Sequence, residues 1–159
     1  MICGLDNEYG VNAPFYNMED GSVMTVFRYK EQHQSYPGRV HGGMITAMLD
    51  EMGLRSLWAK ELSEETFGVT ISLDTKYRKP VPYETELIGR GVVVKNTSHF
   101  IITDSYIMDK EGEILANGRI KYIKMDTQKI QEGVEVHEEM PYLVEDGRTE
   151  IEGPFFDNL

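Results

Sequence analysis

Residues 41–58 constrain the fold of this chain more than any other part of the sequence. His41 precedes two glycines, Gly42 and Gly43, and the residues that follow are apolar on nearly every side of a helix. A helix of this kind is enclosed by other parts of its protein. At its start, free N–H groups and the positive end of the helix dipole can meet an electron-rich ligand atom, and glycine lets that atom come close. We therefore predict an enclosed helix over residues 42–60 whose start can bind a ligand.

Two carboxylates lie within this apolar helix, and helical spacing separates them. Glu51 has Arg55 four residues on, which favours a structural ion pair and makes Glu51 only the second candidate acid. Asp50 has Thr46 and Leu54 at the same spacings, so the helix offers it no cation. A buried carboxylate without a partner is costly or stays protonated, which makes Asp50 a candidate for chemistry. A hydrogen bond across a subunit contact accounts for Asp50 equally well at this stage.

The composition indicates one globular domain. A chain of 159 residues, 40% hydrophobic and 27% charged, suffices for a single core. The formal net charge of −11 argues against binding nucleic acid, so any site for an anionic ligand must be a local basic patch. The single Cys3 excludes an internal disulfide and fits a reducing compartment. Neither a signal peptide nor a membrane-spanning apolar run is present, and we expect a cytoplasmic protein without membrane contact.

Metal and cofactor sites find no support in the sequence. The spacing of the four histidines is not that of metal ligands, and no phosphate-binding or dinucleotide motif occurs; the histidines are His33, His41, His99 and His137. We therefore expect neither a metal nor a cofactor.

Segments that alternate with period two flank the predicted helix. One strand before it and four after it predict an α+β fold in which the sheet curls around the helix. These strands are predicted over residues 21–30, 67–79, 84–94, 99–108 and 114–125. Residues 1–20 are predicted to be irregular, and residues 109–112 to form a hairpin loop that ends in glycine.

Two further predictions concern the longest strand and the end of the chain. Strict alternation over residues 67–79 places Leu73, Thr75 and Tyr77 on one side and Thr70 on the other. Residues 126–159 are acidic, carry several glycines and prolines and have no sustained period. They are predicted to form a C-terminal extension that follows a domain of residues 1–125.

The run from His41 to Glu51, H-G-G-M-I-T-A-M-L-D-E, resembles the signature of the PaaI-like acyl-CoA thioesterases of the hotdog-fold superfamily. The start of the chain, Cys3 to Val11, is similar to their C-G-x-x-N-x-x-G pattern, and residues 77–80 extend the likeness. The resemblance covers roughly residues 3–125. It implies a curled antiparallel sheet of five or six strands wrapped around one long central helix.

The resemblance also implies a role for each matching position in hydrolysis of an acyl-CoA thioester. Asp50 matches the catalytic acid, a general base on water or a nucleophile toward the thioester carbonyl. Gly42 matches the residue whose N–H polarises that carbonyl. His41 matches a neighbour that orients the thioester, although capping the loop by a hydrogen bond explains it as well. Thr70 matches a hydroxyl that holds the attacking water in some relatives.

Contacts to CoA and departures from the family pattern complete the predicted site. Gly43 and the basic cluster of Lys76, Arg78 and Lys79 are predicted to bind the substrate, the cluster through CoA phosphates at an exposed rim. Solubilising charge on an edge strand explains each of these cations as well. Where some relatives carry an Asn or Gln six residues before the His, this chain has Ser35, with Gln34 beside it. Whether Gln34 substitutes is left open.

Family members join two subunits edge to edge, with the acid from one and the H-G-G donor from the other. The resemblance therefore implies a homodimer, or a homotetramer built from dimers. Two other functions compete with hydrolysis: a non-enzymatic acyl-CoA binding or sensing module, and a hotdog-type dehydratase or hydratase. The position of His41 before Gly-Gly argues against the latter. The sequence leaves open the acyl group and the choice between CoA and acyl carrier protein.

Overall fold

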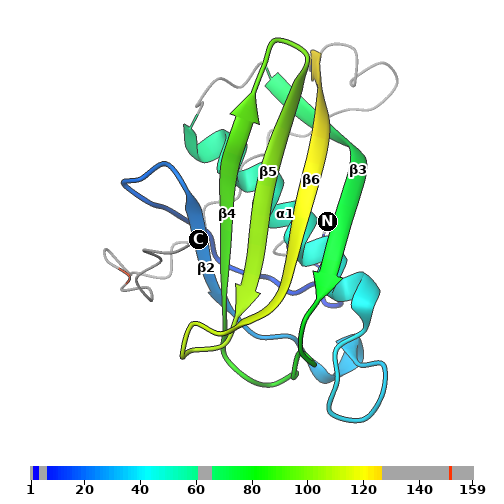
Figure 1. The fold of residues 1–159 in the computed structure, drawn as a ribbon. Coiled ribbons are helices and arrows are strands. Elements are labelled where there is room, and N and C mark those ends of the chain that lie inside the picture. Colours follow the sequence, from blue (N-terminus) through cyan, green and yellow to red (C-terminus); the bar gives the residue numbers. More distant parts are fainter. Residues whose placement is uncertain (1, 4–6, 61–65, 127–150, 152–159) are drawn as a thin grey trace.

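The fold consists of one six-stranded antiparallel sheet and one long helix (Figure 1). The computed structural model describes residues 2, 3, 7–60, 66–126 and 151. The sheet has the order β1-β2-β4-β5-β6-β3, so β3 lies at an edge. The elements are β1 (Tyr16–Asn17), β2 (Val23–Phe27), the 3₁₀ turn η1 (Glu31–His33), α1 (Gly42–Lys60), β3 (Thr66–Tyr77), β4 (Leu87–Asn96), β5 (Phe100–Met108) and β6 (Ile114–Asp126).

The predicted α+β plan is confirmed. The helix has the predicted bounds, and the five predicted strands are present with small shifts at their ends. The hairpin between β5 and β6 turns at Gly112, whose φ of 85° suits glycine and whose N–H donates to the Asp109 carbonyl. The lead-in predicted to be irregular contains β1, because Tyr16 and Asn17 pair with Met24 and Val23 across a tight turn.

Small residues let α1 lie close against the concave face of the sheet. A Cβ at Gly91 of β4 would collide with the Met52 carbonyl, and one at Gly89 would collide with the Met52 sulfur. The side chains between helix and sheet form the main core, together with residues of the lead-in and loops. Its fully or nearly buried members include Phe27, Tyr29, Ile45, Met48, Leu49, Met52, Leu87, Ile107 and Ala116.

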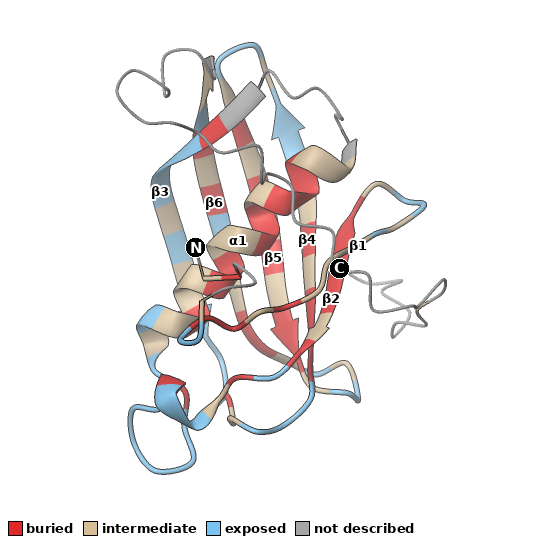
Figure 2. Cartoon of the chain, turned by 180° about the vertical axis from the view of Figure 1, so that it is seen from behind, coloured by how far each residue is buried: buried red, intermediate tan, exposed pale blue. Residues whose placement is uncertain are grey.

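The N-terminal segment covers the side of α1 that faces away from the sheet (Figure 2). Cys3 is buried, and its sulfur lies 3.8 Å from the sulfur of Met48. A hydrogen bond of 2.7 Å from the Val11 N–H to the Ile2 carbonyl, beside Gly10, brings residue 11 back to the start of this segment. A Cβ at Gly10 would lie 2.5 Å from that carbonyl oxygen, so the turn requires glycine. The lead-in thus provides part of the enclosure predicted for the helix.

A β-bulge corrects the predicted alternation along β3. Thr70 pairs with Tyr122 of β6, but Ser72 pairs with Lys121, so Ile71 is an extra residue in the ladder. As a result, Thr70 faces the helix and so does Leu73, which packs against the cluster around Leu57. The prediction that Thr70 lies on the opposite side from Leu73, Thr75 and Tyr77 is therefore wrong.

Most of the predicted extension, residues 126–159, lies outside the described residues. Of its described part, Asp126 ends β6, and Ile151 packs against an apolar cluster on the outer face of the sheet. The buried members of that cluster are Met24, Ile88 and Met108.

Candidate active site

The start of α1 leaves one main-chain donor open. His41 precedes the helix, and its Nδ1 accepts a hydrogen bond of 3.0 Å from the Gly43 N–H. The His41 carbonyl accepts from the N–H groups of Met44 and Ile45. Within the described parts of the chain, no group accepts a hydrogen bond from the Gly42 N–H. The first turn therefore presents a single free donor, at the predicted position, and His41 acts as a cap.

Two hydroxyl groups of β3 and one of α1 lie together at this helix start. The Tyr77 hydroxyl donates to the Gly42 carbonyl at 3.0 Å and lies 2.6 Å from the Thr46 hydroxyl. Thr46 in turn lies 3.4 Å from the Thr75 hydroxyl. A Cβ at Gly42 would stand 3.3 Å from the Tyr77 oxygen, which is tighter than an ordinary contact. Tyr77 thus anchors the first turn, a role that the sequence analysis did not predict.

Asp50 lies two helical turns further along the same face and is half-buried. Its carboxylate accepts the hydrogen bond of the Thr70 hydroxyl, which is 2.9 Å from one carboxylate oxygen and 3.1 Å from the other. The prediction of an enclosed acid without a partner is therefore corrected. Because β3 is an edge strand, this face of α1 stays partly open, and the partner is a neutral hydroxyl donor.

The main chain of Asp50 has a second support. The Tyr122 hydroxyl donates to the Asp50 carbonyl at 2.8 Å, and Tyr122 is almost fully buried. Tyr122 was predicted from the sequence only as part of a strand, since no local spacing relates residue 122 to residue 50. The one sequence feature that indicates this contact is Gly53. A glycine inside a helix is unfavourable, so its presence suggests that another group packs closely against the helix there.

Glu51 forms the ion pair with Arg55 that its spacing predicted. Its carboxylate pairs with Arg55 at 3.0 Å, and the exposed fractions of the two side chains are only 15% and 7%. The Arg55 guanidinium also lies over the Phe15 ring, 4.7 Å from its centroid, and 5.5 Å from that of Trp58. These contacts hold the lead-in against α1 on a face of the helix distinct from that of Asp50.

The predicted basic cluster is only partly free. Lys79 forms an ion pair with Glu113, and the Arg78 Nε donates to the Asn117 side chain at 2.7 Å. Lys76 is exposed and has no ionic partner within the described residues. Gln34 and Ser35 are both exposed in the loop that follows η1.

The described residues contain neither a metal-binding cluster nor a membrane-spanning helix. No group of three or more His, Cys, Asp or Glu side chains there could hold a metal ion. Among the described helices, none is long and apolar enough to cross a membrane.

A curled antiparallel sheet around one long helix is the architecture of the hotdog fold. Within this class the chain belongs to the thioesterase superfamily, whose family model matches residues 37–116. The predicted family resemblance and fold are thereby confirmed.

Two curated relatives are acyl-coenzyme A thioesterases. THEM4 of Mus musculus is 26% identical over 128 residues, which cover 79% of this chain and 52% of that protein. Acyl-coenzyme A thioesterase 13 of Homo sapiens is 23% identical over 100 residues, 62% of this chain and 70% of the relative. The chain thus spans about half the length of the THEM4 relative.

Solved structures share the fold at low sequence identity. A hypothetical thioesterase from Streptococcus pneumoniae, solved with coenzyme A, has a TM-score of 0.64 and 19% identity and covers 77% of this chain and 91% of its own. A phenylacetic acid degradation-related thioesterase from Ralstonia eutropha has a TM-score of 0.64 and 17% identity, with coverages of 71% and 85%.

Proposed function

We propose that this chain hydrolyses an acyl-CoA thioester to a free acid and CoA. The main support for this function is that a hydrogen-bond donor and a carboxylate, two groups with complementary catalytic roles, lie along one face of α1. A single open N–H at Gly42 suits the oxygen of a thioester carbonyl, and a carboxylate at Asp50, oriented by Thr70, suits a water molecule. The acyl-coenzyme A thioesterases among its relatives support the same substrate class.

In the proposed reaction, Asp50 acts as general base. It takes a proton from water while the water oxygen bonds to the thioester carbon, and the carbonyl oxygen becomes an oxyanion. The Gly42 N–H donates to that oxyanion at the positive end of the helix dipole. When the C–S bond breaks, the electron pair leaves with the CoA sulfur, which receives the proton. Direct attack by the Asp50 carboxylate, with hydrolysis of the resulting anhydride, uses the same two groups.

The spacing of these two groups supports a site that is shared between two copies of the chain. Gly42 and Asp50 are eight residues apart in one helix, which separates them by about 12 Å along its axis. Reacting atoms must lie about 3 Å from their catalytic groups, so one thioester carbonyl cannot meet both groups of the same helix. We infer that the donor of one chain faces the acid and Thr70 of its partner.

The edge strand supports this dimer. β3 has a neighbour on one side only, and it carries the apolar side chains of Val69 and Ile71, which are 38% and 52% exposed. An exposed apolar edge strand is a ready surface for pairing with another chain. Pairing of two β3 strands would cover these side chains and bring the two helices together, in a homodimer or a homotetramer made of dimers.

CoA is expected to bind at the rim beyond the end of β3. Lys76 and Arg78 can contact phosphates there, whereas Lys79 must first leave Glu113. The Gly43 N–H already donates to His41, so Gly43 is expected to contribute to substrate binding only by letting the substrate approach its backbone closely. The cytoplasmic location predicted from the sequence stays a prediction.

The proposal is tested with a panel of acyl-CoA esters of different chain length and aromatic character. A thiol-detecting reagent follows the release of CoA, and calorimetry measures binding separately. We expect turnover of at least one ester, and its abolition in Asp50→Asn with binding retained. Binding of esters without turnover by the intact chain would instead support the sensing module.

A further inference from the structure

We propose that Tyr122 is a positioning residue, which sets the place of Asp50 relative to Thr70. This inference rests on the proposed hydrolase function and adds to it a residue that lies outside the family signature. Its basis is the direct pairing of Thr70 and Tyr122 across β3 and β6. Both side chains face α1, and each donates its hydroxyl to Asp50.

The two hydrogen bonds act on different parts of Asp50. Thr70 reaches the carboxylate oxygens at 2.9 and 3.1 Å, and Tyr122 reaches the main-chain carbonyl at 2.8 Å. One fixes the direction of the side chain, and the other fixes the backbone from which that side chain starts. Because Thr70 and Tyr122 are neighbours across the β3–β6 ladder, the sheet fixes both the side chain and the main chain of Asp50.

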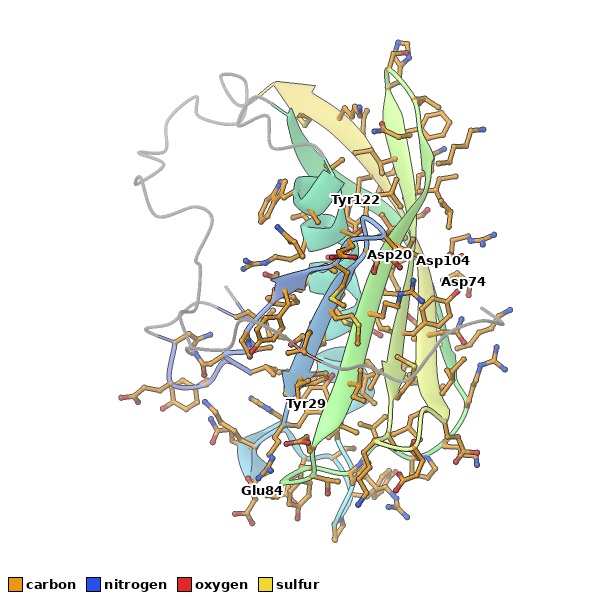
Figure 3. The ribbon with its side chains drawn as sticks, turned by 90° about the vertical axis from the view of Figure 1, so that its left-hand side faces the viewer. Asp20, Tyr29, Asp74, Glu84, Asp104 and Tyr122 are labelled. Carbon is orange, nitrogen blue, oxygen red and sulfur yellow. The ribbon has the colours of Figure 1, made fainter. Side chains whose placement is uncertain are left out.

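Tyr122 is itself held firmly. It lies inside the sheet, paired with Thr70 on one side and with Ile101 of β5 on the other, and is 1% exposed. Figure 3 shows Tyr122 on the helix side of the sheet, opposite to Asp74 and Asp104. Burial, and then the negative charge of Asp50, raise the pKa of Tyr122, so the hydroxyl keeps its proton and remains a donor.

Gly53 makes this contact possible. A Cβ at residue 53 would collide with the Tyr122 hydroxyl and would lie 2.5 Å from the Thr103 hydroxyl. A glycine inside a helix costs about 1 kcal/mol relative to alanine. That cost is offset by the approach of the tyrosine ring to the helix backbone one turn after Asp50.

The experiment compares two tyrosines that make the same kind of contact. Tyr29 is also buried, and its hydroxyl donates to a carbonyl of α1, that of Met44, at 3.3 Å. Tyr122→Phe and Tyr29→Phe therefore each remove one hydroxyl from a buried ring against the same helix. A purely structural role predicts that both variants lose melting temperature and that both keep kcat.

For Tyr122→Phe we expect kcat to fall about tenfold with KM unchanged, since a small misplacement of a catalytic group is costly. Tyr29→Phe should keep its kcat. In a Thr70→Val background the further loss caused by Tyr122→Phe should shrink, because the two hydroxyls act on one residue. Equal kcat values in the two Tyr→Phe variants would overturn the inference.

Crystal structures of both variants provide a readout that needs no turnover. The contacts of the Asp50 carboxylate with Thr70, at 2.9 and 3.1 Å, should lengthen or break in Tyr122→Phe and persist in Tyr29→Phe. Unchanged contacts in Tyr122→Phe contradict the inference even if the chain is no hydrolase. A wild-type chain that turns over no ester contradicts the proposed function instead, so the two failures are distinguishable.

Discussion

The Thr70 hydroxyl lies 2.9 and 3.1 Å from the two carboxylate oxygens of Asp50, although the residues are 20 positions apart in the sequence. A hydroxyl has one hydrogen to donate, whereas the two carboxylate oxygens together can accept several hydrogen bonds. The carboxylate therefore keeps capacity to accept a hydrogen bond from a water molecule. This relationship explains how a half-buried acid, with no cation beside it among the described residues, can be held in one orientation.

Substitution of Thr70 tests whether the hydroxyl matters beyond packing. Thr70→Val keeps the shape of the side chain and removes the donor, so we expect a rate of thioester hydrolysis lower by about tenfold or more, at the lower end of general-base effects. Thr70→Ser keeps the donor and should retain most of the rate. Steady-state kinetics measure both. Equal activity in the Val and Ser variants would show that the hydroxyl is dispensable.

The two neighbouring acids should respond in opposite ways. Asp50→Asn is expected to lower the hydrolysis rate by about a hundredfold or more, as for loss of a general base. Glu51→Gln should keep the rate but lower the free energy of unfolding by about 1–3 kcal/mol, because it weakens a buried charged hydrogen bond to Arg55. Kinetics and denaturant unfolding check the two results. An inactive Glu51→Gln variant together with an active Asp50→Asn variant would mean that Glu51, and not Asp50, is the catalytic acid.

Gly42→Ala should reduce turnover more than stability. Alanine favours the helix, but its methyl group would stand 3.3 Å from the Tyr77 hydroxyl and crowd the approach to the open N–H. Gly118→Ala is the control, because a Cβ there meets only ordinary contacts at 3.4 Å or more. We expect kcat/KM to fall in Gly42→Ala and to stay unchanged in Gly118→Ala. Parallel losses of melting temperature and kcat/KM in Gly42→Ala would assign the glycine to packing.

Mixing inactive variants tests the shared site. Asp50→Asn lacks the acid and Gly42→Ala has an impaired donor. If each site combines both groups from different chains, a heterodimer of the two variants has one site with neither change. Exchange of subunits should therefore restore activity, toward half of the wild-type value per heterodimer. No recovery after verified exchange, or a fully active monomer in sedimentation, would place the site within one chain.

Cys3 should be unreactive in the folded protein. Burial raises the pKa of the Cys3 thiol to about 12, so at pH 8 it is protonated as well as inaccessible. A thiol reagent should detect no thiol in the native protein and one per chain after unfolding in urea. Because the pKa of the Cys3 thiol in the folded chain exceeds its ordinary value of 9.0, this group favours folding below pH 9, and its contribution is lost as the pH rises toward 12. Rapid labelling of the native protein would contradict this burial.

Features that depend on neighbours along the chain could be predicted from the amino-acid sequence. The bounds of α1 followed from the long, nearly all-apolar run that begins at the two glycines, and the ion pair of Glu51 with Arg55 followed from a spacing of one helical turn. The alternation of buried residues along β5 was also predicted correctly. These features are local, so the period of the pattern carries the information.

Contacts between segments that are distant in the sequence could be read only from the folded chain. The extra residue at Ile71 turns Thr70 toward Asp50, and only the pairing of β3 with β6 reveals it. Likewise, Tyr122 reaches the Asp50 carbonyl because two strands and a helix converge there, 72 residues apart in the sequence. Register shifts and contacts between distant segments leave no periodic trace, since a bulge changes which side every later residue faces without changing the residues themselves.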